Sequence, residues 1–199
     1  MSVASRMTMS NMSVEAGAKC GLFAPDEKTC VYCRIPYDDK IKNLQADDDA
    51  TYSRILRYRA EDFVPVCACP SLVDNIKPVS KLQGTKVNQV FLGSCTNGRL
   101  EDLRTAAMIL KGKHVAPFVK MIVTPASRKI YRQALHDGTI EILSDAGCII
   151  TTPGCGLCCG RGGGILSDDE VVVATNNRNF LGRMGTSRSE ERRVGKESR

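Results

Sequence analysis

The chain has 199 residues, of which 42% are hydrophobic and 25% are charged, and this composition is typical of a globular protein with one or two domains. The net charge is only +6, and aromatic residues make up 5% with no tryptophan, which argues against a nucleic-acid-binding surface. The sequence contains no apolar run long enough for a membrane-spanning helix, and its first residues lack the apolar stretch of a signal peptide. We therefore predict a cytoplasmic protein that binds neither nucleic acid nor membranes.

The ten cysteines require a chemical explanation. In a reducing compartment such a number indicates metal ligation rather than a disulfide framework. Cys67, Cys69 and Cys148 stand among apolar neighbours and are predicted to be buried as small hydrophobic side chains. Cys30 and Cys33 form a C-x-x-C pair without further ligands at metal-site spacing, and we interpret this pair as incidental.

Residues 7–19 are predicted to form a helix, because Met9 and Met12 recur at the spacing of one helical face. Asn11 and Glu15 lie four positions apart on another face of this helix. Their spacing alone indicates no more than a solvated polar edge.

Residues 38–62 are polar and are predicted to form an exposed connection with one irregular strand near 52–58. A short strand broken by prolines is expected within 63–70, followed by a linker that ends near Gly84. The last twelve residues show no apolar periodicity and are predicted to be a non-native tail outside the fold. The predicted division is therefore 1–83 for the end of one domain plus the linker, 84–187 for a second domain, and 188–199 for the tail.

From residue 86 onward, strands alternate with helices of about 10 to 15 residues, which is typical of a parallel α/β sheet with helices on both faces. Strands are expected at 86–92, 118–123, 148–150 and 171–174, with the main helices at 99–111 and 124–135 and a short one at 139–146. Ligands of such sheets bind beyond the carboxyl ends of the strands. The loops that follow these strands are therefore predicted to form one site.

Three of these loops carry the residues that we expect to act. Cys95 follows the first strand, and Cys155 and Cys158 follow the third in a second C-x-x-C. Three thiolates among glycines, with no nearby histidine, favour an iron–sulfur cluster over zinc, and such a cluster leaves one iron without a protein ligand. Cys159 is an alternative ligand to Cys158.

Arg178 and Arg183 follow the fourth strand. Planar guanidinium groups match carboxylates in a bidentate manner, so this pair beside a cluster suggests a di- or tricarboxylic acid substrate.

At these residues the chain resembles the aconitase superfamily, in particular its isopropylmalate dehydratase and homoaconitase branch. The resemblance covers nearly all of residues 7–185, and its motifs occur in family order. The matching motifs are Ser10-Asn11-Met12-Ser13-Val14-Glu15-Ala16-Gly17-Ala18-Lys19, Val73-Asp74-Asn75-Ile76-Lys77-Pro78-Val79-Ser80, Gly93-Ser94-Cys95-Thr96-Asn97-Gly98-Arg99-Leu100-Glu101-Asp102, Pro153-Gly154-Cys155-Gly156-Leu157-Cys158 and Asn177-Arg178-Asn179-Phe180-Leu181-Gly182-Arg183-Met184-Gly185.

The resemblance implies three-layered parallel sheets of the aconitase type, truncated at both ends, with 1–83 as the end of one such domain and 84–187 as the cluster-binding domain. It also implies a [4Fe–4S] hydro-lyase that isomerises isopropylmalate in leucine biosynthesis, or homocitrate or a related methylmalate. Its partner would be a small subunit with a swivelling domain. By resemblance the site comprises cluster ligands Cys95, Cys155 and Cys158, carboxylate-binding Arg178 and Arg183, catalytic Glu15, and Asn11 and Asn177 beside the cluster.

The sequence also departs from the family pattern. The family's large subunit contains further histidine and aspartate residues before the first matching motif, and the swivelling domain is absent. We therefore expect a fragment that is inactive alone. Two other classes remain open: a non-catalytic module that binds metal through Cys30, Cys33, Cys155 and Cys158, and an inactive gene fragment.

Overall fold

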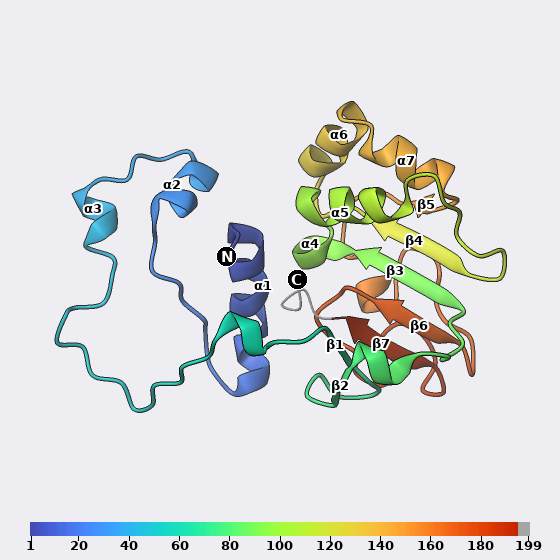
Figure 1. Cartoon of the computed structure of the whole chain (residues 1–199), viewed down its shortest axis with the longest axis horizontal. Helices are drawn as coiled ribbons and strands as arrows, with labels where there is room; N and C mark the ends of the chain where they lie inside the picture. The colour runs from blue at the N-terminus through green and yellow to red at the C-terminus, as the bar shows by residue number, and fades with distance from the viewer. Residues whose placement is uncertain (195–199) are drawn as a thin grey trace. The chain divides into compact units, whose positions relative to one another are not determined.

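The computed structural model describes residues 1–194 and divides the chain into two compact units, Met1–Val64 and a second unit that begins at Pro65 (Figure 1). Each unit is described by itself. Among the described residues, no helix is long and apolar enough to cross a membrane.

The first unit begins with a helix whose buried face differs from the predicted one. Its elements are α1 (Val3–Met12), the 3-10 helix η1 (Ser13–Ala16), α2 (Glu27–Cys33), α3 (Asp39–Lys42) and the 3-10 helix η2 (Ala60–Asp62). The α1 helix starts before residue 7 because the Ser2 hydroxyl accepts a hydrogen bond from the Ser5 N–H at 3.1 Å. Ala4 and Thr8 form its buried side, whereas Met9 is exposed. The predicted helix is therefore confirmed, but its predicted apolar face is wrong.

An ion pair joins α1 to α2. The Arg6 guanidinium donates to both carboxylate oxygens of Asp26 at 2.6 and 2.9 Å, and the same carboxylate caps α2 by accepting from the Thr29 N–H. Arg6 thereby holds the pKa of Asp26 well below its usual range.

The structure contains no strand between residues 43 and 59, so the strand predicted near 52–58 is wrong.

The second unit is built on a seven-stranded sheet in the order β2-β1-β7-β6-β3-β4-β5. The five strands from β7 to β5 are parallel, and β1 and β2 are antiparallel to their neighbours. This arrangement confirms the predicted α/β class. The strands are β1 (Val66–Ala68), β2 (Ile76–Pro78), β3 (Gln89–Gly93), β4 (Lys120–Thr124), β5 (Ile149–Ile150), β6 (Val171–Ala174) and β7 (Glu190–Val194); the other elements are the 3-10 helices η3 (Val79–Leu82) and η4 (Gly156–Cys159), and the helices α4 (Ser94–Asn97), α5 (Leu100–Leu110), α6 (Arg128–His136) and α7 (Thr139–Asp145).

Two apolar cores form because successive strand residues face opposite sides of the sheet. On one side Leu92 and Val123 pack beneath α5, α6 and α7, which lie together over the sheet in Figure 1. On the other side Phe91 and Ile122 pack against Leu157 of η4 and against the loops that follow it. The second core therefore fixes the cysteine loop to the sheet.

The boundaries of the units differ from the predicted ones. The division falls after Val64 rather than after residue 83, because β1 and β2 pair with the sheet of the second unit. Residues 190–194 form β7 between β1 and β6, so the prediction that 188–199 lie outside the fold is wrong for this stretch. Residues 195–199 of that tail lie outside the described residues.

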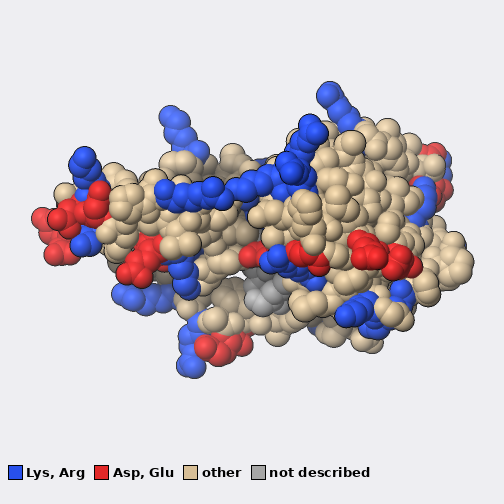
Figure 2. All heavy atoms as spheres, turned by 90° about the horizontal axis from the view of Figure 1, so that it is seen from above, with Lys and Arg blue, Asp and Glu red and all other residues tan. Residues whose placement is uncertain are grey.

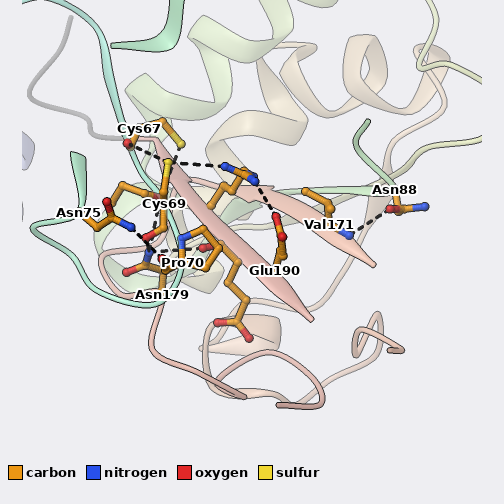
Figure 3. A network of polar contacts seen from close by, with 11 residues as sticks. Cys67, Cys69, Pro70, Asn75, Asn88, Val171, Asn179 and Glu190 are labelled. Atoms are coloured by element: carbon orange, nitrogen blue, oxygen red, sulfur yellow. Dashed lines mark hydrogen bonds and ion pairs between the residues drawn. The ribbon is translucent and has the colours of Figure 1, made fainter. Parts of the chain in front are cut away.

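Asparagine side chains join β1 and β7 to the rest of this unit (Figure 3). The Asn179 amide donates to the carbonyls of Cys69 at 2.8 Å and Glu191 at 3.3 Å, and the Asn75 amide donates to the Pro70 carbonyl at 2.8 Å. These bonds give backbone carbonyls of β7 and of the loop after β1 a side-chain donor. On the surface seen in Figure 2, basic and acidic side chains are both widely spread, and neither sign covers that face continuously.

Candidate functional site at the carboxyl edge of the sheet

The loops that carry the predicted site residues open at one edge of the parallel sheet. Cys95 lies in α4 directly after β3. In the loop after β5, Cys155 comes immediately before η4 and Cys158 lies within it. Arg178 and Arg183 follow β6. Because β3, β5 and β6 run in the same direction, their carboxyl ends meet on one side, as predicted.

The Cys95 loop is held by close backbone packing. Gly98 lies against β4 and the start of α4, where an added Cβ would be only 2.8 Å from the Ser94 carbonyl and would also clash with the Thr124 carbonyl. The Gly98 carbonyl accepts from the Ala126 N–H at 2.8 Å, which ties the loop to the end of β4. Ser94, Thr96 and Asn97 are buried, whereas Cys95 is exposed. The loop therefore turns one cysteine outward from a buried support.

The second cysteine loop needs glycine at defined positions. Gly156 and Gly160 have φ angles of 52° and 67°, in the left-handed region that other residues rarely adopt. An added Cβ at Gly156 would lie 3.0 Å from the Thr124 hydroxyl oxygen, and one at Gly160 would lie 3.0 Å from the Arg183 carbonyl. Leu157 between them is 1% exposed and anchors the loop in the core.

Three neighbouring thiols influence the thiol of Cys155. Partial burial, followed by the charges of Cys95, Cys159 and Cys158, raises the pKa of the Cys155 thiol. Cys159 also contacts Cys155, and its thiol donates to the Gly156 carbonyl at 3.5 Å. The helix α4, which carries Cys95, contacts η4, which carries Cys158 and Cys159, so the two cysteine loops are neighbours.

Arg183 reaches this group of thiols. Its guanidinium Nη2 lies 3.7 Å from the Cys158 sulfur, while its Nε–H is buried and has no hydrogen-bond partner among the described residues. Arg178 is half-buried on the same loop, and its carbonyl accepts from the Asn176 amide at 2.6 Å. Arg183 therefore offers an unused donor beside the cysteines.

A buried polar network connects the Cys95 loop to the arginine loop. The Asn97 amide donates to the Asn177 side-chain oxygen at 2.7 Å and to the Thr175 carbonyl. The Thr175 hydroxyl in turn accepts from the Gly93 N–H at 3.0 Å and donates to the Asn97 carbonyl at 3.4 Å. The sequence analysis did not select Asn97 or Thr175 as site residues, although Thr175 directly follows β6 and Asn97 ends the short helix α4 after β3. The network fixes the spacing between the loop of Cys95 and the loop of Arg178.

Asn11 and Glu15 belong to the first unit. Asn11 is an exposed residue near the end of α1, and Glu15 is half-buried in η1. Their assignment to the site remains a prediction.

Within residues 1–194, no group of three or more histidine, cysteine, aspartate or glutamate side chains is arranged to hold a single metal ion. The alternative module with Cys30, Cys33, Cys155 and Cys158 as ligands draws on both units, and it stays a prediction. A cluster differs from a single ion because its ligands surround several metal atoms rather than one.

Sequence comparison relates this geometry to known proteins. The signature of the Aconitase family (aconitate hydratase) matches residues 1–82 and 71–191, which together form most of the chain. The chain belongs to the aconitase family. The predicted resemblance is thereby confirmed.

Curated members of this family share about half of their residues with the chain over the matched region. The 3-isopropylmalate dehydratase large subunit of Sulfurihydrogenibium sp. (strain YO3AOP1) is 52% identical over 190 residues, which cover 96% of this chain and 44% of that protein. The same-named subunit of Elusimicrobium minutum is 51% identical over 94% of this chain and 45% of its own length. A probable methanogen homoaconitase large subunit from Methanosarcina mazei is 50% identical over 93% of this chain and 47% of its own length. The chain thus spans a little less than half the length of these relatives.

Proposed function

We propose that this chain supplies the cluster-binding part of an aconitase-family hydro-lyase of the 3-isopropylmalate dehydratase type. The observation that carries the proposal is that the loops of Cys95, Cys155 and Cys158 open at one edge of the parallel sheet, where Arg183 Nη2 lies 3.7 Å from the Cys158 sulfur. Names of relatives at about 50% identity support the same type of reaction.

The residues at this edge fit a [4Fe–4S] cluster. Thiolates are the ligands that such clusters require, and cluster sulfurs accept hydrogen bonds from nearby donors. Gly156 and Gly160 allow the backbone to come close, and the buried Arg183 Nε–H is a donor without a partner in the described protein. We assign the three ligands to Cys95, Cys155 and Cys158, because Arg183 contacts Cys158 whereas the Cys159 thiol faces its own loop carbonyl.

The chain's own groups bind and orient the substrate in this proposal. Arg178 and Arg183 bind two carboxylates of a hydroxy acid through bidentate hydrogen bonds and neutralise its charge. The Asn97–Asn177 contact keeps the arginine loop at a constant distance from the Cys95 loop. Bound to three cysteines, a [4Fe–4S] cluster supplies an iron that can act as a Lewis acid toward the substrate hydroxyl.

Glu15 and Asn11 of the first unit and Asn177 of the second complete the assignment. We propose that Glu15 transfers a proton at the substrate and that Asn11 and Asn177 donate hydrogen bonds near the cluster. These roles follow from the family resemblance of their motifs. A carboxylate in this position can act as a general acid or base when it lies within hydrogen-bond reach of the reacting group.

The partner and the substrate are proposed from the relatives' names. The term "large subunit" supports a separate small subunit that completes the active site. Isopropylmalate is the first candidate substrate, and homocitrate is the alternative that the Methanosarcina relative supports.

The function can be tested with the chain reconstituted anaerobically with iron and sulfide. The reconstituted chain is combined with the small subunit and with the part of the large subunit that lies outside the match. Dehydration of isopropylmalate or homocitrate is followed through the ultraviolet absorbance of the alkene product. We expect turnover of one hydroxy acid, abolished in Arg183→Gln and in Cys158→Ser. A fully assembled, iron-loaded complex without turnover of either acid would contradict the proposal.

A further inference from the structure

Ser94, the residue before Cys95, has an unusual backbone conformation. Its φ angle is 72°, in the left-handed region that favours glycine, and it begins the short helix α4 directly after β3. A residue with a Cβ is strained in this region, and such strain persists only where the surrounding structure fixes the backbone. Glycine would adopt the conformation without strain, so the backbone alone gives no reason for a serine at this position.

The side chain of Ser94 is also unusual, because its hydroxyl is buried without a partner. The residue is 1% exposed, and its Oγ has no hydrogen-bond partner within residues 1–194. A buried hydroxyl without a partner destabilises a fold, since it loses the hydrogen bonds that water gives it in the unfolded chain. Ser94 thus combines a strained backbone with an unsatisfied donor.

Both features lie beside the cysteines. Cys95 follows Ser94 in α4, and α4 contacts η4, which carries Cys158. A second buried donor without a partner in the described chain, the Nε–H of Arg183, belongs to the guanidinium whose Nη2 lies 3.7 Å from the Cys158 sulfur. Two loops at this edge therefore each hold a buried, unused donor next to a cysteine. Sulfur atoms of iron–sulfur clusters accept hydrogen bonds from such donors, and these bonds help to set the reduction potential.

We propose that the Ser94 hydroxyl donates a hydrogen bond to a sulfur atom of the cluster or of its Cys95 ligand. This inference rests on the proposed function, because it requires a cluster held by Cys95, Cys155 and Cys158. The bond gives the buried hydroxyl an acceptor. It is stronger toward the reduced cluster, whose sulfur atoms carry more negative charge, so it raises the reduction potential.

The test compares Ser94→Ala with Ser94→Gly in the full chain, reconstituted anaerobically with iron and sulfide. Both substitutions remove the hydroxyl, but only glycine also relieves the strain at a φ of 72°. The reduction potential is measured by dithionite titration with redox mediators, followed through visible absorbance and electron paramagnetic resonance. We expect both variants to assemble the cluster with a potential shifted to more negative values by a similar amount.

Ser127→Ala is the matched control. The Ser127 hydroxyl is used within the fold, because it accepts from the Ile130 N–H at 3.3 Å as the cap of α6. Its removal should lower Tm and leave the reduction potential unchanged. In the chain without iron, Ser94→Ala should not lower Tm, because it removes a hydroxyl that has no partner. A serine with a purely structural role would show the opposite pattern, with a lower Tm and an unchanged potential.

The outcomes separate this inference from the proposed function. A parent chain that forms no cluster contradicts the proposed function, and the inference falls with it. A cluster that forms in the parent chain and in both Ser94 variants with the same potential overturns the inference alone. It is also overturned if Ser94→Ala lowers the Tm of the chain without iron, or if Ser127→Ala shifts the potential as much as Ser94→Ala does.

Discussion

Replacing Gly98 with alanine tests how the Cys95 loop is supported. The new methyl group would enter a space bounded by backbone, at 2.8 Å from the Ser94 carbonyl and 3.0 Å from the Gly93 Cα, and closer still to the Thr124 carbonyl. Backbone atoms cannot rotate away as a flexible side chain can, so the loop or β4 must move. Overpacking of this kind costs about 1–3 kcal/mol, which corresponds to a fall in Tm of roughly 3–10 °C for a unit of this size.

Gly154→Ala provides a matched control in the other cysteine loop. An added Cβ at Gly154 meets no atom within 4 Å, and its φ is not in the left-handed region. Thermal and urea unfolding are measured on both variants, together with iron content after reconstitution. We expect Gly98→Ala to lose stability and iron, and Gly154→Ala to retain both. Equal Tm values for Gly98→Ala and the parent chain would refute the packing described for the Cys95 loop.

Four further predictions follow from buried or charged groups. Thr175→Val should lower the free energy of unfolding by about 1–3 kcal/mol, because the Gly93 N–H loses its acceptor, while Thr175→Ser should restore it in urea titrations. Hydrogen bonds from Thr139 and Arg104 lower the pKa of Asp137, so the stability that this carboxylate contributes should be lost as the pH falls below about 4. In thermal scans at low pH, Asp137→Asn should therefore make Tm less dependent on pH. Burial raises the pKa of Cys148 to about 11; stability should therefore fall as the pH rises from about 9, where the unfolded thiol ionises first, and iodoacetamide should label Cys148 only after unfolding. Burial also raises the pKa of Glu191, because the charged carboxylate is poorly solvated there. Glu191→Gln should therefore raise Tm at pH 7, since it removes the charge but keeps the acceptor for the Met184 N–H. A lower Tm would contradict the buried position of this side chain.

The parallel sheet could be predicted because its strands have strong apolar patterns. The strands expected at 86–92, 118–123 and 171–174 correspond to β3, β4 and β6 with shifts of only a few residues. Buried strands of a parallel sheet are apolar on both faces, so their pattern stands out from the flanking loops. The chain order of strands and helices then placed the cysteine and arginine loops at one edge.

Other features left no such pattern. The β7 strand reads Glu-Glu-Arg-Arg-Val, a pattern that predicts a tail, yet it pairs with β6 and β1 in the sheet. There the buried Glu191 carboxylate accepts from the Met184 N–H at 2.6 Å. The helix expected to start at Thr124 begins later, because the Ser127 hydroxyl caps it. The Asn97–Thr175 network joins residues far apart in the sequence, and only the fold brings them together.

The central claim is that Cys95, Cys155 and Cys158 hold one [4Fe–4S] cluster. Iron and acid-labile sulfide per chain, with the visible absorption spectrum, are measured after anaerobic reconstitution of the parent chain and of single Cys→Ser variants. We expect about four irons per chain and a brown colour in the parent chain, as such a cluster requires. Both should be lost in each of the three ligand variants and retained in Cys148→Ser and Cys159→Ser. A colourless parent chain, or iron binding unchanged in the Cys95, Cys155 and Cys158 variants, would contradict the account.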